Sequence, residues 1–197
     1  MTLAETLERA VRAGGGQSSD FDLNPNYVLP DDRVLQPAGV LVALLGAVNG
    51  PQVLLTKRSS RLKHHPGQIA FPGGKVDPGD GGPIGAALRE AEEEVGLPQG
   101  TVDIFGELPP HETVTGFTVT PVLGWIRADF RPVPEAGEVD EVFTVPLAHV
   151  AERANYQVQS RLWRGQRRFY YTVPYGPYYI WGATARILRG LAERLAA

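Results

Sequence analysis

Three glutamates near the middle of the chain have the type and spacing of a metal-binding cluster. They are Glu90, Glu93 and Glu94, in the segment "ALREAEEEVG" that follows a glycine-rich stretch. Side chains at i, i+3 and i+4 of a helix are neighbours, so three carboxylates placed there repel one another unless a cation lies between them. Magnesium is typically held by a few carboxylates together with substrate phosphates. The spacing indicates a metal site for a phosphorylated substrate, and for the helix alone a solvated acidic face remains the alternative.

The residues around these glutamates predict a helix that begins at Pro83 and ends before Gly96. Proline suits the first helical position, and glycine suits the residue just past the end. At about 100° per residue, the apolar side chains fall on a separate face that we expect to pack inward. This face comprises Ile84, Ala87, Leu88, Ala91 and Val95. Glu92 points elsewhere and is expected to be solvated.

The preceding stretch "FPGGKVDPGDGG", residues 71–82, brings bare backbone close to the start of this helix. Glycines allow unusual φ angles and close ligand approach, although many such loops are simple turns. A Walker loop would need glycine at Ile69 and a hydroxyl at Val76, and a G-x-G-x-x-G fingerprint would need glycine at Ile84. The acidic spacing of an EF-hand is not matched either. These three motifs are therefore excluded.

Together the loop and the helix resemble the Nudix box, G-x5-E-x7-R-E-U-x-E-E-x-G-U, in which U is apolar. The second half matches at every position in "REAEEEVGL", residues 89–97. In the first half, Gly74 and Asp80 keep the expected mutual spacing but lie one residue early, with aspartate in place of glutamate. We predict that Asp80 supports the loop by accepting backbone N–H bonds near the helix start. The resemblance implies an α/β fold, a Nudix-type α/β/α sandwich with a mixed β-sheet.

A second segment resembles the signature of the coenzyme A pyrophosphatase branch of the Nudix superfamily, L-L-T-x-R-S-x3-R-x3-G-x3-F-P-G-G. Residues 54–74, "LLTKRSSRLKHHPGQIAFPGG", meet every fixed position except that Lys63 replaces arginine. "TGFTVTPVLGWI" and "IWGATARIL" are also similar to that branch, so the resemblance covers about residues 34–190. It implies divalent-metal-dependent hydrolysis of the pyrophosphate bond of coenzyme A and its derivatives. The products would be 4′-phosphopantetheine and adenosine 3′,5′-bisphosphate.

The resemblance also implies roles for individual residues. Mg²⁺ or Mn²⁺ would be held by Glu90, Glu93, Glu94 and the backbone carbonyl of Gly74. Arg89 would orient a helix glutamate by a salt bridge. For the general base, "PEAGEVDEVF" offers Glu135, Glu138 and Glu141. We favour Glu138, which precedes a strand as a Glu-Val pair, although each of the three fits a surface carboxylate equally well.

A basic run lies just before the glycine loop. The chain as a whole carries a net charge of −3, so an anionic ligand such as coenzyme A needs a local basic surface, which this run supplies. We predict that Arg58, Arg61, Lys63 and Gln68 bind the substrate, with a solvated basic loop as the alternative. His64 and His65 are expected to be surface residues, and His111 and His149 to be ordinary. The aromatic stretch 169–181, "FYYTVPYGPYYIW", suits either adenine stacking or ordinary core packing.

The rest of the chain predicts one Nudix domain over residues 1–197. It begins with a helix at 3–12 and a connection within 1–33, and it ends with a helix at 183–197. Two apolar runs flank the turn Asn49–Gly50 and predict a hairpin, and further strands are expected within 102–108, 117–130 and 141–147. A short helix within 147–154 and two aromatic strands within 160–182 follow. The amphipathic ends are compatible with a homodimer, which the sequence does not settle.

Composition excludes several classes of protein. There are no cysteines, which excludes disulfides, thiolate metal sites and cysteine nucleophiles. The slightly acidic balance argues against a nucleic-acid partner. No apolar run approaches the roughly 20 residues of a membrane span, and no signal peptide is visible, so we predict a cytoplasmic protein without a membrane partner.

Two other functions compete with the coenzyme A hypothesis. One is a Nudix pyrophosphatase for another nucleoside diphosphate derivative, such as ADP-ribose or NADH, against which the 54–74 signature argues. The other is a non-catalytic Nudix-like nucleotide sensor. Such a protein would be expected to lose helix glutamates, and all are present here.

Overall fold

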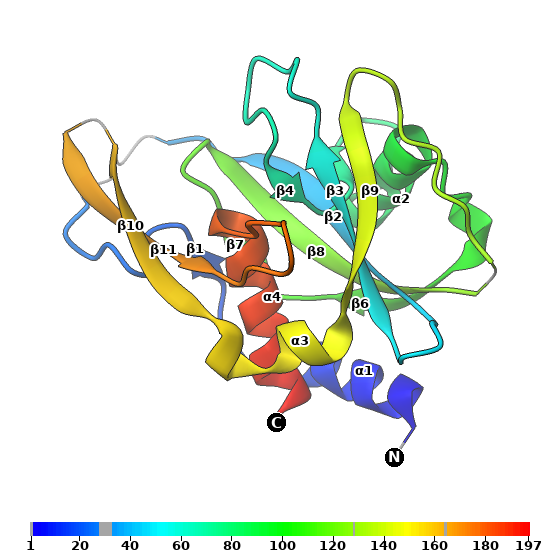
Figure 1. Cartoon of the computed structure of the whole chain (residues 1–197). Helices are drawn as coiled ribbons and strands as arrows, with labels where there is room; N and C mark the ends of the chain where they lie inside the picture. Colours follow the sequence, from blue (N-terminus) through cyan, green and yellow to red (C-terminus); the bar gives the residue numbers. More distant parts are fainter. Residues whose placement is uncertain (1, 28–32, 128, 164) are drawn as a thin grey trace.

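A mixed β-sheet separates two layers of helices in the computed structural model, which describes residues 2–27, 33–127, 129–163 and 165–197 (Figure 1). Helix α2 (Pro83–Val95) covers one face of the sheet. Helices α1 (Leu3–Arg12), α3 (Leu147–Ala151) and α4 (Gly182–Leu195) cover the other. The predicted α/β/α sandwich is confirmed, while residues 28–32 of the expected N-terminal connection lie outside the described residues. The single domain over residues 1–197 stays a prediction.

Strand β2 (Gln36–Leu45) lies at the centre of the sheet. It pairs in parallel with β8 (Phe117–Ile126) and antiparallel with β3 (Gln52–Arg58) and β5 (Gly73–Lys75). Five further strands complete the nine strands of this sheet among the described residues: β6 (Val102–Glu107) and β7 (His111–Glu112) pair with β8, β4 (Ile69–Ala70) and β9 (Val139–Pro146) pair with β3, and β1 (Ser18–Ser19) pairs with β7. The topology places β5, which carries two glycines of the loop, directly beside β2.

Side chains of β2 alternate between two hydrophobic cores. Leu41 and Ala43 are fully buried beneath α2, whereas Val42 and Leu44 are fully buried toward α1 and α4. A period of two is the pattern of a strand covered on both faces. This two-sided burial fixes the sheet between the helical layers and gives α2 a rigid platform.

Helix α2 lies unusually close to that platform because both surfaces are small. Its buried apolar residues are Ala86, Ala87, Ala91 and Val95. A Cβ built on Gly39 of β2 would collide with the backbone carbonyl of Pro83, so only glycine permits this approach. The predicted ends at Pro83 and Gly96 are confirmed, and Gly96 has the left-handed conformation of a C-cap, with φ 70°. The prediction that Ile84 faces inward was wrong. Ile84 is exposed, because the residues of α2 that pack against Gly39 are Pro83 and Ala87.

The remaining predicted elements are present with adjusted ends. The hairpin β2–β3 turns at Asn49–Gly50. The strand expected within 102–108 is β6, that within 117–130 is β8, and that within 141–147 is β9. The expected short helix is α3. A 3₁₀ turn precedes β6 at Gln99–Thr101 and another follows α3 at Arg153–Asn155. The strands of two or three residues, β1, β4, β5 and β7, were not predicted, since such short segments show no period.

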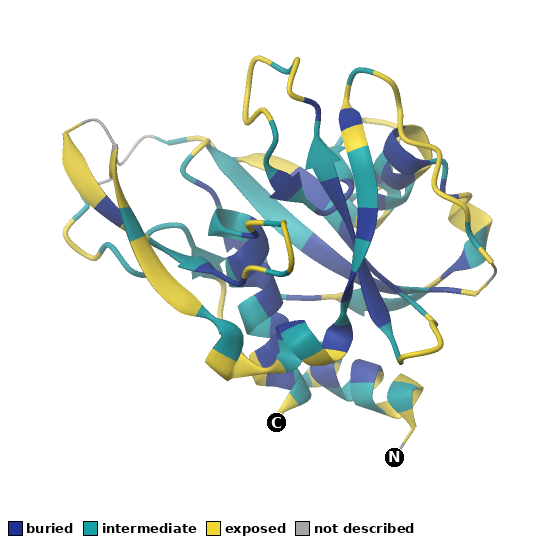
Figure 2. Cartoon of the chain, viewed as in Figure 1, coloured by how far each residue is buried: buried dark blue, intermediate teal, exposed yellow. Residues whose placement is uncertain are grey.

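Strands β10 (Gln157–Trp163) and β11 (Gln166–Thr172) form a separate antiparallel hairpin. It extends away from the main sheet, and most of its described surface is exposed (Figures 1 and 2). The two ends of the chain lie together, with α1 against α4 (Figure 1). Within the described ranges, the helices are all too short or too polar to cross a membrane.

Candidate active site

The glycine strand β5 runs directly against the glutamates of α2. The backbone N–H of Gly73 donates to Oε2 of Glu94 at 3.2 Å. A Cβ built on Gly74 would collide with the carboxylate of Glu90. The two glycines therefore let bare backbone pack on the carboxylates, which is the close approach that the sequence predicted for this loop.

Glu94 is the buried member of the glutamate cluster, which we define as Glu90, Glu93 and Glu94. Only 5% of Glu94 is exposed. Burial raises the pKa of its carboxyl group to about 7, and the negative charges of Glu90 and Glu138 add to this effect. The Gly73 N–H and the positive charge of Arg58 act in the opposite direction. A carboxylate in this situation gains most from a nearby cation.

Arg89 holds the other two glutamates in place. Its Nη1 donates to Oε1 of Glu90 and to Oε2 of Glu93, both at 3.0 Å. Burial raises the pKa of Glu90 above its ordinary value, Arg89 opposes this, and the charges of Glu93 and Glu138 add to it. The salt bridge that we expected between Arg89 and a helix glutamate is present, and Arg89 forms it with both Glu90 and Glu93.

Asp80 anchors the loop from the opposite side of Arg89. Its Oδ1 accepts from Arg89 Nε at 2.8 Å, and its Oδ2 accepts from Arg89 Nη2 at 3.1 Å and from the backbone N–H of Asp77 at 2.7 Å. These bonds, with that of Arg89 first, lower the pKa of Asp80. The backbone bond agrees with the predicted loop-supporting role, although its donor is Asp77 of the loop itself. The ion pair with Arg89 had not been predicted.

Glu138 lies at the start of β9, beside the end of β3. Its backbone carbonyl accepts from the N–H of Ser59 at 2.8 Å. Its charge raises the pKa values of both Glu90 and Glu94, so its carboxylate lies within electrostatic reach of the cluster. Glu141 instead accepts from the hydroxyl of Tyr178 at 2.5 Å. Of the three carboxylates in this segment, Glu138 is the one that the structure links to both Glu90 and Glu94.

The donor chemistry of the cluster fits a hard divalent ion, because its carboxylates repel one another and supply oxygen ligands. In the part of the chain that the structure describes, however, no three acidic or histidine side chains converge into a ready-made metal site. Nη1 of Arg89 contacts both Glu90 and Glu93, so those carboxylates would have to share their oxygens between the guanidinium and an ion. The predicted ligand set Gly74, Glu90, Glu93 and Glu94 therefore stays a prediction.

A cleft of about 250 Å³ opens on the other side of β5. Two residues of the predicted site line it, Arg58 and Gln68, together with Gly73 of the glycine loop. Arg61 and Lys63 do not line it and are exposed, and Arg61 contributes to lowering the pKa of Asp140. The structure thus brings two of the four predicted substrate-binding residues to the cleft and leaves two outside it.

The cleft contains residues that the sequence did not single out. His65, which is exposed as expected of a surface residue, lines it, and so do Arg161 and Arg168 of the β10–β11 hairpin. Tyr170 and Trp181 come from the aromatic stretch, where stacking was one of two open alternatives. Arg161, Arg168 and Tyr170 lie far along the chain from the glycine loop and α2, so no local pattern connects them to that part of the site.

One wall of the cleft is fixed by a buried histidine. His111 is fully buried, with Nδ1 2.9 Å from the hydroxyl of Ser18 and Nε2 3.3 Å from Oδ1 of Asp20. The N–H of Val114, a lining residue, donates to Oδ2 of Asp20 at 2.9 Å. Burial raises the pKa of Asp20, but His111 and these bonds outweigh it and lower the pKa overall. His111 is therefore a structural residue that ties the N-terminal segment to the cleft.

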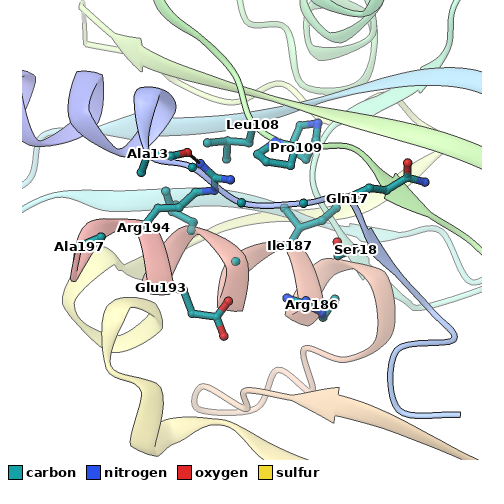
Figure 3. A pocket seen from close by; sticks show the side chains of 16 residues that line it. Ala13, Gln17, Ser18, Leu108, Pro109, Arg186, Ile187, Glu193, Arg194 and Ala197 are labelled. Carbon is teal, nitrogen blue, oxygen red and sulfur yellow. Dashed lines mark hydrogen bonds between the residues drawn. The ribbon is translucent and has the colours of Figure 1, made fainter. Parts of the chain in front are cut away.

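A second pocket, of about 300 Å³, lies between the glycine-rich segment 13–18 and α4 (Figure 3). Arg194 reaches across it and donates to the backbone carbonyls of Ala13 and, at 3.2 Å, of Ala10. None of the candidate catalytic or substrate-binding residues lines this pocket. It is the joint between the two ends of the chain, and it lies apart from the glutamate cluster.

Known sequences share the Nudix resemblance. A family model described as "NUDIX domain" matches residues 35–169. The chain is 45% identical to the protein named "Uncharacterized Nudix hydrolase NudL" of Enterobacter sp. (strain 638) over 158 residues, which is 80% of this chain and 82% of that protein. It is 46% identical to the protein of the same name from Escherichia coli (strain K12) over 145 residues, 74% of this chain and 76% of that protein.

Solved structures share the fold. A MutT/nudix family protein from Enterococcus faecalis has a TM-score of 0.53 at 16% identity, over 100% of this chain and 75% of that one. The NUDIX domain of Shewanella oneidensis NrtR, solved in complex with ADP ribose, has a TM-score of 0.53 at 17% identity, over 99% of both chains. At these identities the likeness concerns the fold alone.

Proposed function

Because the chain belongs to the Nudix hydrolase family, we propose that it hydrolyses the pyrophosphate bond of coenzyme A and its derivatives, as a coenzyme A diphosphatase that uses Mg²⁺ or Mn²⁺. The observation that carries this proposal is the placement of a basic cleft immediately beside the glutamate cluster. Gly73 belongs to both, since it donates to Glu94 and lines the cleft. A substrate with a pyrophosphate and a further anionic group would occupy both places at once.

The metal-holding residues in this proposal are Glu90, Glu93, Glu94 and the carbonyl of Gly74. When bound, such an ion supplies charge neutralisation on the pyrophosphate and favours ionisation of water. The contacts of Arg89 with Glu90 and Glu93 hold both carboxylates on one side of α2. The Gly73 N–H fixes Glu94 in the same way. The chain thereby presents its carboxylates in a fixed arrangement, which limits the reorganisation needed when substrate binds.

Arg58 and Glu138 have complementary roles beside this arrangement. The positive charge of Arg58 acts on Glu94, so Arg58 lies near enough to the glutamates to attract an anionic group of a substrate bound in the cleft. Glu138 is the proposed general base: it accepts a proton from water as the water oxygen bonds to phosphorus and the bridging P–O bond breaks. The bridging oxygen leaves with one product phosphate. These roles are proposals for residues whose positions support them.

Product identification tests the function directly. We expect the protein with Mg²⁺ and coenzyme A to release 4′-phosphopantetheine and adenosine 3′,5′-bisphosphate, both recognised by mass. Removal of the metal with EDTA should stop the release, and added Mg²⁺ or Mn²⁺ should restore it. Cleavage of ADP-ribose or NADH but not coenzyme A would indicate a pyrophosphatase for another nucleoside diphosphate derivative. Binding without cleavage of any of these compounds would indicate a nucleotide sensor. The cytoplasmic location and the lack of nucleic-acid and membrane partners stay predictions from the sequence.

A further inference from the structure

Three basic side chains meet at the cleft from two distant parts of the chain. Arg58 ends β3, His65 lies in the following loop, and Arg161 comes from β10; all three line the cleft. Burial first, and then the positive charges of Arg58, His64 and Arg161, lower the pKa of His65. Their mutual repulsion disfavours the arrangement unless an anion is part of it.

The charges of Arg58 and Arg161 are not used in ion pairs. Among the described residues, neither arginine has a carboxylate within ion-pair distance. Arg168 faces Arg161 directly in the β10–β11 ladder. It is buried, and its Nη2 donates to the backbone carbonyl of Asp20 at 3.4 Å. Like charges directly opposite each other weaken a strand pair, so the pairing of Arg161 with Arg168 is unfavourable for the hairpin.

The side chain of Arg161 is nevertheless held in place. Its guanidinium carbon lies 4.4 Å from the centre of the Trp181 ring, a cation–π contact. Tyr170 packs edge-on against the same ring, with centroids 5.2 Å apart. Stacking covers the flat face of a guanidinium and leaves the N–H groups at its rim free to donate. Trp181 therefore fixes Arg161 at the cleft with its hydrogen-bonding rim available.

The loop opposite is also held in an unfavourable conformation. His65 has a φ of 55°, and no other non-glycine residue among those described has a positive φ. The left-handed region is costly for a residue with a side chain, and such strain is typically retained at binding and catalytic sites. Strain at His65 and like charge at Arg161 are independent observations, and both favour a site for an anion.

We propose that Arg161, with Arg58 and His65, forms a subsite for a phosphomonoester dianion of the substrate, separate from the pyrophosphate that is cleaved. This inference rests on the proposed function, in which the pyrophosphate belongs beside the glutamates on the other side of β5. Planar guanidinium groups bind phosphate through two hydrogen bonds each, so two arginines match a doubly charged group. A nucleotide with a second phosphate, such as the 3′-phosphate of coenzyme A, fits this chemistry.

Binding measurements without metal test the subsite separately from catalysis. Calorimetry in EDTA compares adenosine 3′,5′-bisphosphate with adenosine 5′-monophosphate, which lacks the second phosphate. The wild-type protein should bind the bisphosphate about tenfold or more tightly, the effect of a charge-assisted contact. Arg161→Ala should remove most of this preference by weakening the bisphosphate alone. Equal affinities in the wild type, or equal losses for both nucleotides in the variant, would overturn the proposal.

Two further variants complete the design. Arg167→Ala is the matched control, because Arg167 is an exposed arginine of the same hairpin that does not line the cleft, and it should keep the preference. Arg161→Lys keeps a charge but loses the planar fork, so an intermediate preference is expected, and it carries the test if Arg161→Ala does not fold. If coenzyme A is not hydrolysed but the Arg161-dependent preference is found, the subsite holds and the proposed function fails. If coenzyme A is hydrolysed and the preference is missing, only the subsite fails.

Discussion

The two sides of strand β5 differ in charge and in the way the chain builds them. On one side, the glutamate cluster is assembled from α2, and Arg89 neutralises part of its negative charge. On the other, the cleft gathers Arg58, His65 and Arg161, for which the described residues provide no ion pair. The cluster comes from one short segment, whereas the cleft joins residues about a hundred positions apart. We propose bond cleavage for the first region and substrate selection for the second.

The largest effect is expected from removing the charge of the buried glutamate. Glu94→Gln keeps the shape of the side chain and an acceptor for the Gly73 N–H but removes a proposed metal ligand. Turnover of coenzyme A should fall by about 10²-fold or more. Glu92→Gln on the exposed side of α2 is the control and should remain as active as the parent. Steady-state kinetics at saturating Mg²⁺ measures both, and turnover within a few-fold of the parent would remove Glu94 from the cluster's chemistry.

The same substitution should stabilise the metal-free protein. Glu94 has a pKa of about 7 in the folded chain against 4.5 ordinarily. The folded state therefore binds the proton more tightly, and this contribution to stability is present below about pH 4.5 and is lost as pH rises through 7. The difference between these two pKa values is equivalent to about 3 kcal/mol of unfolding free energy. In EDTA, urea unfolding should find Glu94→Gln more stable than the parent by about 1–3 kcal/mol at pH 8 and similar to it at pH 4.5.

That stability prediction distinguishes a functional cluster from a structural one. A carboxylate kept for function costs stability until its ligand binds. If Glu94→Gln were equally or less stable than the parent at pH 8, Glu94 would be part of the structural framework, and the contrast between the two sides of β5 would weaken.

A smaller loss of activity is expected from closing the gap between β5 and α2. Gly74→Ala adds a Cβ that collides with the carboxylate of Glu90, and the flexible end of that side chain will move aside. We expect turnover to fall by roughly ten- to fiftyfold from a displaced ligand, with little change in unfolding free energy. Gly79→Ala lies in the same loop with no atom within 4 Å of the new Cβ and serves as the control. Parent-like turnover in Gly74→Ala would show that the Glu90 position is not critical.

The smallest loss concerns Asp80, which contacts Arg89 rather than the glutamates. Asp80→Asn retains an acceptor for the Asp77 N–H, and Arg89 keeps its bonds to Glu90 and Glu93. Activity should fall by less than about tenfold, whereas Glu90→Gln should lose about 10²-fold. Both variants are compared at saturating Mg²⁺. An Asp80→Asn protein as inactive as Glu90→Gln would place Asp80 in the catalytic set.

The acidic side was predictable because its information is local. A helix period, a proline start and a glycine end place Glu90 and Glu94 correctly from sequence, and only Ile84 was misplaced, at an end where packing against Gly39 decides the burial. The burial of Glu94 itself was not predicted, since a helical wheel gives direction but not depth. It follows from the short strand β5 lying over α2, and β5 is too short to show a pattern.

The basic side was predictable only in part because it depends on long-range packing. Arg58 and Gln68 were identified through the motif that contains them, and both line the cleft. The motif alone does not show that His65 lines the cleft whereas Lys63 does not. Arg161 is positioned by Trp181, twenty residues later, and by a hairpin outside the main sheet. Contacts of this kind leave no periodic or spacing signal in the sequence.

A single competition assay tests most directly the division between cleavage and selection. Coenzyme A, dephospho-coenzyme A, ADP-ribose and NADH are mixed at equal concentration with the protein and Mg²⁺, and their relative depletion gives the ratios of kcat/KM. We predict that coenzyme A disappears first, ahead of dephospho-coenzyme A by roughly ten- to a hundredfold, the effect of a charge-assisted contact to the 3′-phosphate. Equal depletion of these two compounds, or faster depletion of ADP-ribose or NADH, would contradict the account.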